Sequence, residues 1–439
     1  MRGSFDRAGH RQFAWCLYDW ASSGFVTSIM VALFPPFFRS LVTTAGGTAA
    51  EATAYWGYTT AAALALIAFG SPLWGALADA RRGARGDLAR FAGLGIAATL
   101  AAVTIGSGQW RYAALLFVLA NIGFAGANVH YESLLPHIAP RSEIDRVSTR
   151  GYALGYLGGG MLLLAHLWIV SDPGAFGLPS VRAALNVAFI SVAAWWALFS
   201  LPLLRAWPLP PPASTPHAPI PGAFPLRALT ISLRRLRATL GAARREPRVW
   251  YFLLAYWCYN DGIGTIVKMA TAYGDEIGLG LTPMLRALVL TQVVGIPATL
   301  GMGRLARHIG TRRTILIGLG LYAGLTASAY FMRTAAHFYL LAGGIGLVQG
   351  GTQALSRSLF ARLIARPRSG EWFGFYSTSG RMAGMAGPLL FGLVTQLAGG
   401  GRYGILIVLA FFIAGATLLA RLPLDEAPSS PGAPRPATR

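Results

Sequence analysis

Long apolar stretches recur from one end of this chain to the other, and they constrain the fold more than any other feature. Each is near or above the roughly 18 residues that a helix needs to cross a bilayer, and each is bounded by Arg, Pro or Gly clusters. Only 12% of the residues are charged, against about 25% in a soluble domain, so a water-soluble surface is excluded. We therefore predict an all-α membrane protein with twelve transmembrane helices. The predicted spans are 13–38, 54–79, 90–108, 112–135, 151–170, 183–204, 249–273, 284–303, 314–332, 336–361, 372–398 and 402–420.

The basic residues, which give a formal net charge of +21, alternate between the two sides of these spans. Of the 37 Lys and Arg residues, 29 lie in the termini and even-numbered connections and 6 in the odd-numbered ones, while Lys268 and Arg381 lie inside spans. The positive-inside rule then predicts that both termini are cytoplasmic. Because the charge is dispersed over seven cytoplasmic segments, no nucleic-acid partner is expected. Arginine outnumbers lysine 36 to 1, which favours a multi-pass protein of a bacterial inner (plasma) membrane.

One long break in the hydropathy divides the chain into two halves. The predicted organisation is an N-terminal six-helix half over 1–204, a cytoplasmic linker over 205–248, a C-terminal six-helix half over 249–421 and a disordered cytoplasmic tail over 422–439. The linker begins Pro-rich, and residues 226–245 then repeat leucine at helical spacing among arginines. This pattern suits an amphipathic helix in contact with the lipids of the anionic leaflet, and a solvated basic linker is the equal alternative.

Two short patterns occur in both halves, as expected for a duplicated transporter fold. The first span carries W-C-x-x-D from Trp15, and the seventh carries it from Trp257. A G-x-L-A element is followed by Asp79 after the second span and by Arg307 after the eighth. The two cysteines of the chain lie within the first pattern, so neither a disulfide framework nor a metal site is expected.

The G-x-L-A-D element followed by arginines resembles the loop signature of the major facilitator superfamily. Longer blocks are similar to the branch that includes the fungal vacuolar effluxer and its bacterial relatives, over nearly the whole chain. These blocks include WCLYDWASSGF from Trp15, RGYALGYLGGGMLLL from Arg150, YNDGI from Tyr259 and QALSRS from Gln353. The resemblance implies a secondary transporter that works by alternating access and whose fungal members are associated with amino-acid efflux.

The same resemblance implies a cytoplasmic gate at the two loop signatures. Asp79 would latch the outward-facing state by pairing with a nearby arginine or a helix terminus, and the alternative is an ordinary interfacial acid. Arg307 stands where the second copy would carry its acid, so the gate is expected to be asymmetric. The predicted gate residues are Asp79, Arg81, Arg82, Arg307, Arg312 and Arg313.

Polar and ionisable side chains inside the spans are candidates for the transport site, because a charge at bilayer depth costs at least about 2.5–3.5 kcal/mol. In the family fold the first, fourth, seventh and tenth helices line the central cavity, so their polar faces are expected to meet there in a lining of mixed charge. The predicted substrate or coupling-ion residues are Asp19, Asn128, Glu132, Asn260, Asp261, Thr265, Lys268, Gln353, Tyr376 and Arg381. Structural alternatives are an interfacial or gating role for Asp19 and Arg357, and an ion pair between Asp261 and Lys268.

Phosphate-binding loops, zinc motifs and catalytic domains are missing from the sequence, so neither a cofactor nor enzyme activity is expected. We predict a monomeric transporter that exports a small polar solute, an amino acid or similar zwitterion, with coupling to protons left open. Two alternatives remain. One is an exporter of lipophilic drugs or lipids, and the other is a membrane scaffold or receptor that does not transport.

Overall fold

The computed structural model describes residues 2–80, 84–206, 241, 244–276, 281–364, 369–398 and 401–422. The predicted gate residues Arg81 and Arg82 lie outside this part of the chain. Most of the predicted linker also lies outside the described residues, including residues 226–240 of the predicted amphipathic segment. The same holds for nearly all of the predicted tail.

The described residues are helical almost throughout. The N-terminal half contains α1 (Arg2–Gly24), the π-helix η1 (Phe25–Leu33), α2 (Phe34–Thr44), α3 (Ala49–Ala80), α4 (Ala84–Ala101), η2 (Ala102–Thr104), α5 (Trp110–Ser133), α6 (Leu135–Ile138), α7 (Ile144–Ser171), η3 (Gly174–Phe176) and α8 (Val181–Arg205). The C-terminal half contains α10 (Pro247–Glu276), α11 (Leu281–Ile309), α12 (Thr311–Ala329), α13 (Ala335–Leu363), α14 (Ser369–Ala398) and α15 (Gly401–Ala420).

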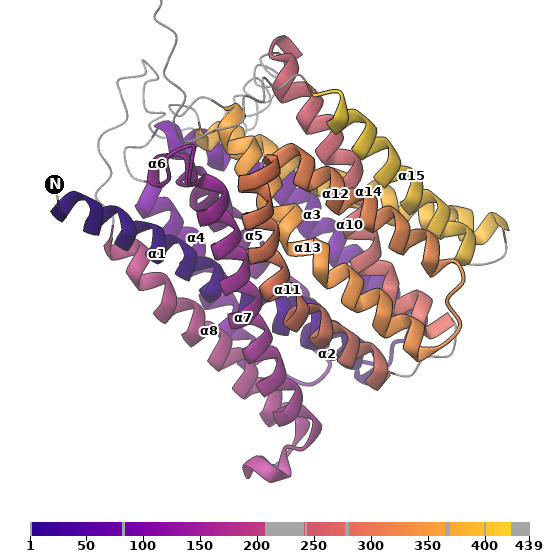
Figure 1. Ribbon diagram of the computed structural model, residues 1–439. Helices are drawn as coiled ribbons and strands as arrows, with labels where there is room; N and C mark the ends of the chain where they lie inside the picture. Colours follow the sequence, from indigo (N-terminus) through magenta and orange to yellow (C-terminus); the bar gives the residue numbers. More distant parts are fainter. Residues whose placement is uncertain are drawn as a thin grey trace, which may run out of the picture.

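Since α1, η1 and α2 follow one another without a break, the described residues form twelve long helical segments, one for each predicted span. Seven of the described segments are long and apolar enough to cross a membrane when judged by length and composition alone. In Figure 1 all of the long helical segments form one bundle, with α1 and α8 on one side and α12 and α15 on the other. The halves meet where α7 packs against α11 and α13 and where α3 packs against α14.

The first span is not a regular α-helix. Pro35 and Pro36 lack an N–H, and in an α-helix their rings would clash with the carbonyls four residues earlier, at Val31 and Ala32. Both of these carbonyls belong to η1, whose wider i→i+5 turn relieves the clash. The N–H of Phe34 accordingly donates to the carbonyl of Ile29, five residues back.

Glycines on α7 allow α1 to approach it closely. A methyl group at Gly151 would lie 2.5 Å from Asp19 Oδ2, and one at Gly155 would lie 2.6 Å from Ser23 Oγ. One turn further along, Thr27 Oγ1 donates to the carbonyl of Gly159 at 2.9 Å. The polar residues that follow Asp19 along α1 and η1 therefore pack against the α7 backbone.

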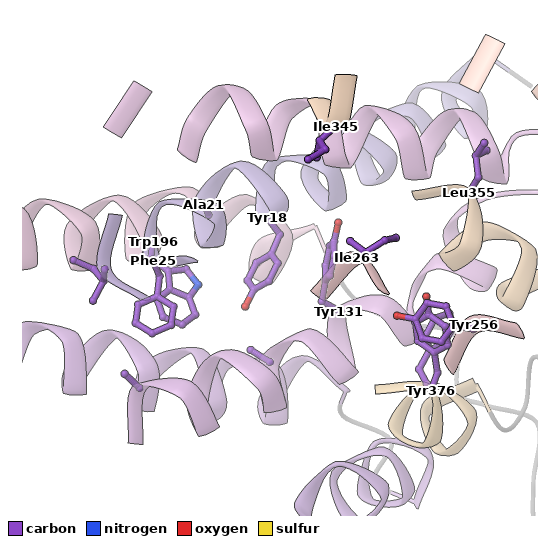
Figure 2. Packing of buried hydrophobic residues seen from close by; sticks show 14 of the residues in the cluster. Tyr18, Ala21, Phe25, Tyr131, Trp196, Tyr256, Ile263, Ile345, Leu355 and Tyr376 are labelled. Atoms are coloured by element: carbon purple, nitrogen blue, oxygen red, sulfur yellow. The ribbon is translucent and has the colours of Figure 1, made fainter. Parts of the chain in front are cut away.

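Large aromatic side chains fill the interior of each half. In the N-terminal half, the Trp196 ring stacks on Phe25 with centroids 5.5 Å apart. In the C-terminal half, Tyr256 and Tyr376 stack at 4.3 Å. Figure 2 shows these two tyrosine rings face to face, and the ring of Tyr18 beside that of Tyr131.

Candidate functional site

Two arginines on the C-terminal part of α13 reach across to the N-terminal half. Arg357 and Arg362 are five residues apart, so the rise of an α-helix separates them by about 7.5 Å along its axis. They form two layers of polar contacts between the halves. The outer layer, around Arg362, lies toward the end of α13 that the charge distribution predicts to be cytoplasmic, and the inner layer surrounds Arg357.

The outer layer is organised by Asp145 in the first turn of α7, whose side chain is only 4% exposed. Its Oδ2 accepts from Arg362 Nη2 at 2.5 Å and from Thr311 Oγ1 at 2.8 Å. Its Oδ1 accepts a short hydrogen bond from Ser358 Oγ. Arg362 Nη1 also donates to Thr311 Oγ1 at 2.9 Å. One carboxylate of the N-terminal half therefore holds three side chains of the C-terminal half, through hydrogen bonds of the strong, charge-assisted kind.

The inner layer is organised by Arg357, whose side chain is 2% exposed. Its Nη2 lies 3.2 Å from Asp19 Oδ2 and 3.0 Å from the carbonyl of Ser148, and its Nε donates to Ser148 Oγ at 2.9 Å. Ser148 Oγ in turn donates to the carbonyl of Ala354 at 2.7 Å. A charge this deeply buried is tolerable only because it is paired and hydrogen-bonded.

Aromatic rings complete the surroundings of Arg357. Its guanidinium carbon lies 4.5 Å from the ring centroid of Tyr152, 4.6 Å from that of Trp15 and 5.6 Å from that of Tyr131. Desolvated cation–π contacts of this kind contribute about 2 kcal/mol. We call the N-terminal residues around this guanidinium the arginine cage. The arginine cage consists of Trp15, Asp19, Tyr131, Ser148 and Tyr152.

A protein-family model described as "Vacuole effluxer Atg22 like" matches residues 9–429 of the chain. The chain belongs to this Atg22-like family. An uncharacterised MFS-type transporter of Bacillus subtilis, YxiO, is 35% identical over 415 residues, which are 93% of this chain and 94% of that protein. Autophagy-related protein 22 of Cryptococcus neoformans is 24% identical over 319 residues. The match covers 69% of this chain but only 56% of the fungal protein, so the chain spans about half the length of that relative.

Solved structures show that this Atg22-like chain has the major facilitator fold. The proton:xylose symporter XylE aligns over 95% of this chain and 96% of its own, with a TM-score of 0.69 and 14% identity. The human organic anion transporter MFSD10 aligns over 94% of this chain and 99% of its own, with a TM-score of 0.68 and 16% identity. The predicted fold class and family are confirmed. The chain is a multi-pass membrane transporter, and its relatives are transporters, not enzymes.

The structure places one predicted site residue of this Atg22-like transporter, Asp19, in the inner layer, and three others on α5 and α13. Asp19 belongs to the arginine cage, and Glu132 on α5 is near enough to Arg357 and Tyr376 to act on both electrostatically. Asn128 and Gln353 are half-buried one turn before Glu132 and Arg357 respectively.

Predicted residues of α10 lie against α14, inside the C-terminal half. Asn260 Nδ2 donates to the carbonyl of Gly380 at 3.2 Å. A methyl group at Gly387 would overlap Thr265 Oγ1 and lie 2.7 Å from Asp261 Oδ1. The side chains of Lys268 and Arg381 lie outside the described part of the structure, although their backbones belong to α10 and α14.

The predicted gate residues that the structure describes lie in two different settings. Arg312 Nη1 donates to the carbonyl of Leu422 at 2.6 Å, which fastens α12 to the end of α15 within one half. Arg307 and Arg313 are exposed at this end of the bundle. Like Arg81 and Arg82, the side chain of Asp79 lies outside the described residues. The outer layer of contacts between the halves instead uses Asp145, Thr311, Ser358 and Arg362, which we did not predict from the sequence.

Within the described ranges, no group of three or more His, Cys, Asp or Glu side chains gathers closely enough to hold a metal ion.

Proposed function

We propose that this Atg22-like transporter exports a small polar solute, an amino acid or similar zwitterion, across a bacterial plasma membrane by alternating access. The observation that carries the proposal is the two-layer contact between the halves. Polar contacts suit a reversible closure, because each charge regains water when the halves separate.

The direction of closure follows from the predicted topology. Both arginine layers lie near the end of α13 that is expected to be cytoplasmic, so the described conformation is closed on the cytoplasmic side. His137 of α6 and Ser369 of α14 add a further contact there, with Nε2 and Oγ 3.1 Å apart. To admit a solute from the cytoplasm, the transporter would have to break the contacts of Asp145 and Arg357 with the opposite half.

Two considerations support a zwitterionic solute. The inner layer contains both signs of charge, because Asp19 pairs with Arg357. The family model is described as "Vacuole effluxer Atg22 like", and the resemblance of the sequence to the fungal effluxer implies amino-acid efflux. A carboxylate that loses Arg357 when the halves separate could take up a proton in its place, which is the requirement for proton coupling.

We also propose how the chain is oriented in the membrane and which lipids it contacts. Both termini would be cytoplasmic, with residues 205–248 linking two six-helix halves and residues 422–439 forming a tail. Residues 226–245 would contact the lipids of the anionic leaflet, and the transporter would work as a monomer.

A lipophilic solute is the second candidate, because the C-terminal half contains a cavity of about 50 Å³ whose lining is apolar apart from Thr265 and Thr326. A cavity that accommodates benzene has about 150 Å³. This cavity is therefore too small for a drug-sized molecule in the described conformation.

Counterflow in proteoliposomes tests the proposal. The native chain, preloaded with an unlabelled amino acid, should accumulate the same labelled amino acid for at least one member of a broad panel. Asp145→Asn should alter the exchange rate, and Asp172→Asn, which changes an exposed loop carboxylate, is the matched control. Failure of folded, monodisperse protein to exchange any amino acid would overturn the choice of solute, and lipophilic solutes would be tested next.

Asp261→Asn and Lys268→Gln extend the counterflow test to the seventh span. If both variants fold and lose exchange, this face belongs to the transport site. If both keep native exchange, the two residues are structural.

A further inference from the structure

The arginine cage is built by one half of the transporter and filled by the other. Trp15 and Asp19 come from α1, Tyr131 from α5, and Ser148 and Tyr152 from α7, whereas the guanidinium belongs to α13. Any movement that separates the halves at this end must therefore draw Arg357 out and leave the cage without its cation.

The part of the cage that α1 and α5 form is held together by contacts within the N-terminal half, so the shape of this part does not depend on Arg357. Trp15 Nε1 donates to the carbonyl of Tyr131 at 2.9 Å, and the rings of these two residues stack at 4.4 Å. The ring of Tyr18 also packs against that of Tyr131, with the two ring centroids 4.8 Å apart. These contacts all join α1 to α5, and a rigid-body movement of the halves would leave them intact.

The chemistry of the cage selects an organic cation. It offers the faces of three aromatic rings, the carboxylate of Asp19 and the carbonyl of Ser148, to which a cation can donate. The indole N–H of Trp15 is already used by Tyr131 and is not available to an anion. A guanidinium suits such a site particularly well, because it is planar, weakly hydrated and able to stack on aromatic rings while it donates to a carboxylate.

An unoccupied cage would be unfavourable, since it would leave the carboxylate of Asp19 without its partner. Asp19 is 17% exposed even in the closed conformation, so a solute group could reach it once α13 has moved away.

We infer that, when the halves separate at this end, the arginine cage binds a guanidinium or ammonium group in the side chain of the transported solute, and that Arg357 is a built-in competitor that expels this group on closure. The inference rests on the proposed transport function and adds to it the charge of the group that is recognised. Solutes with a guanidinium group should be bound best.

Arginine and citrulline form a matched pair of probes, because citrulline has nearly the same shape and no side-chain charge. Binding of each labelled amino acid is measured on the purified full-length chain in detergent. Native protein should bind arginine more tightly than citrulline. Arg357→Met removes the competitor and should tighten arginine binding by about tenfold, because the cage no longer has to be vacated first.

Two further comparisons separate recognition from folding. Asp19→Asn, in the native and the Arg357→Met background, should weaken arginine binding and leave the weaker citrulline binding unchanged. Tyr152→Leu should weaken arginine binding more than Tyr152→Phe does, because only phenylalanine keeps a ring face. The tyrosine pair serves as the test if Arg357→Met does not fold.

Equal binding of arginine and citrulline would overturn the inference, as would an equal loss of both on Asp19→Asn, because a structural role of Asp19 predicts that result. If amino acids exchange in counterflow without preference for cationic ones, the assignment of the cage fails and the transport function stands. If arginine binds in a manner that depends on Asp19 but no amino acid exchanges, the cage stands and the transport proposal fails.

Discussion

Asp145 and Arg362 are 217 residues apart in the chain, yet Asp145 Oδ2 and Arg362 Nη2 lie 2.5 Å apart at the junction of the two halves. Neither residue can keep this contact if the halves separate at this end. Since Thr311 and Ser358 also donate to the same carboxylate, Asp145 is the side chain whose loss should weaken the closed conformation most.

Asp145→Asn should shift the transporter toward the cytoplasm-open conformation. Loss of a hydrogen bond to a charged group costs about 1.5–3 kcal/mol, which corresponds to about a 10- to 150-fold change in the ratio of open to closed protein. Ala354 is fully buried, and its carbonyl contacts the opposite half. The rate at which a thiol reagent labels Ala354→Cys, with Cys16 and Cys258 replaced by serine, reports the opening. The idea fails if Asp145→Asn and the control Asp172→Asn give the same labelling rate.

Asp145→Asn and Arg362→Gln should be strongly non-additive. Removal of either partner leaves the other charge without its main contact, with Asp145 buried and Arg362 half-buried, so the double variant should open less than the sum of the single effects predicts. A coupling energy of about 1–3 kcal/mol is expected for residues in one network. The same labelling assay, applied to the four proteins of the cycle, measures it. Simple additivity would show that the two side chains act independently.

Gly350→Ala should destabilise the closed conformation by a steric effect. A methyl group there would overlap both Thr299 Oγ1 and the ring of Tyr156, which reaches across from α7. Gly320→Ala on α12 is the matched control, since its methyl group would meet nothing within 4 Å. Gly350→Ala should lower the melting temperature and speed the labelling of Ala354→Cys, whereas Gly320→Ala should do neither. Equal melting temperatures would mean that Tyr156 moves aside without cost.

Arg182→Met should destabilise the N-terminal half without affecting the gate. Arg182 Nη2 donates to the carbonyls that end the third span, at Ala102, Val103 and Ile105, over distances of 3.3, 3.2 and 2.7 Å. Its guanidinium also lies 4.7 Å from the ring centroid of Phe37. Arg111→Met is the control, because Arg111 is exposed and stacks only on its neighbour Trp110 among the described contacts. The melting temperature should fall by several degrees for Arg182→Met alone.

The helices could be predicted from the sequence because the bilayer imposes a length of apolar chain on each of them. The residue at which α7 starts could not be predicted in this way. Hydropathy placed the beginning of the fifth span at residue 151, and the helix begins at Ile144. The added turns carry Asp145, Ser148 and Thr149, which are polar and nevertheless buried. Hydropathy reports contact with lipid, and these residues are covered by the opposite half of the protein.

The inner layer was accessible to sequence reasoning only in part. The sequence makes Asp19 a candidate because an acid inside a span is unfavourable without a partner. Both Asp19 and Arg357 lie near the ends of their spans, so an interfacial or gating role is the alternative for each of them. Their contact joins positions 338 residues apart. No local pattern predicts such a pairing, and the cage tyrosines resemble ordinary packing aromatics until the guanidinium is in place.

The π-helix in the first span changes how that span can be compared with others. Each of its turns uses more residues than an α-turn, so each residue turns the chain by less than it would in an α-helix, and the side chains after Leu33 are offset from the positions that the α-helical period predicts. A projection that assumes one period would assign the wrong face to Phe34 and Phe37. Deleting a single residue between 25 and 33 would shorten the wide turns toward an ordinary α-helix and would restore the clash of Pro35 and Pro36 with the carbonyls four residues earlier, so the first span should kink or unwind at this point.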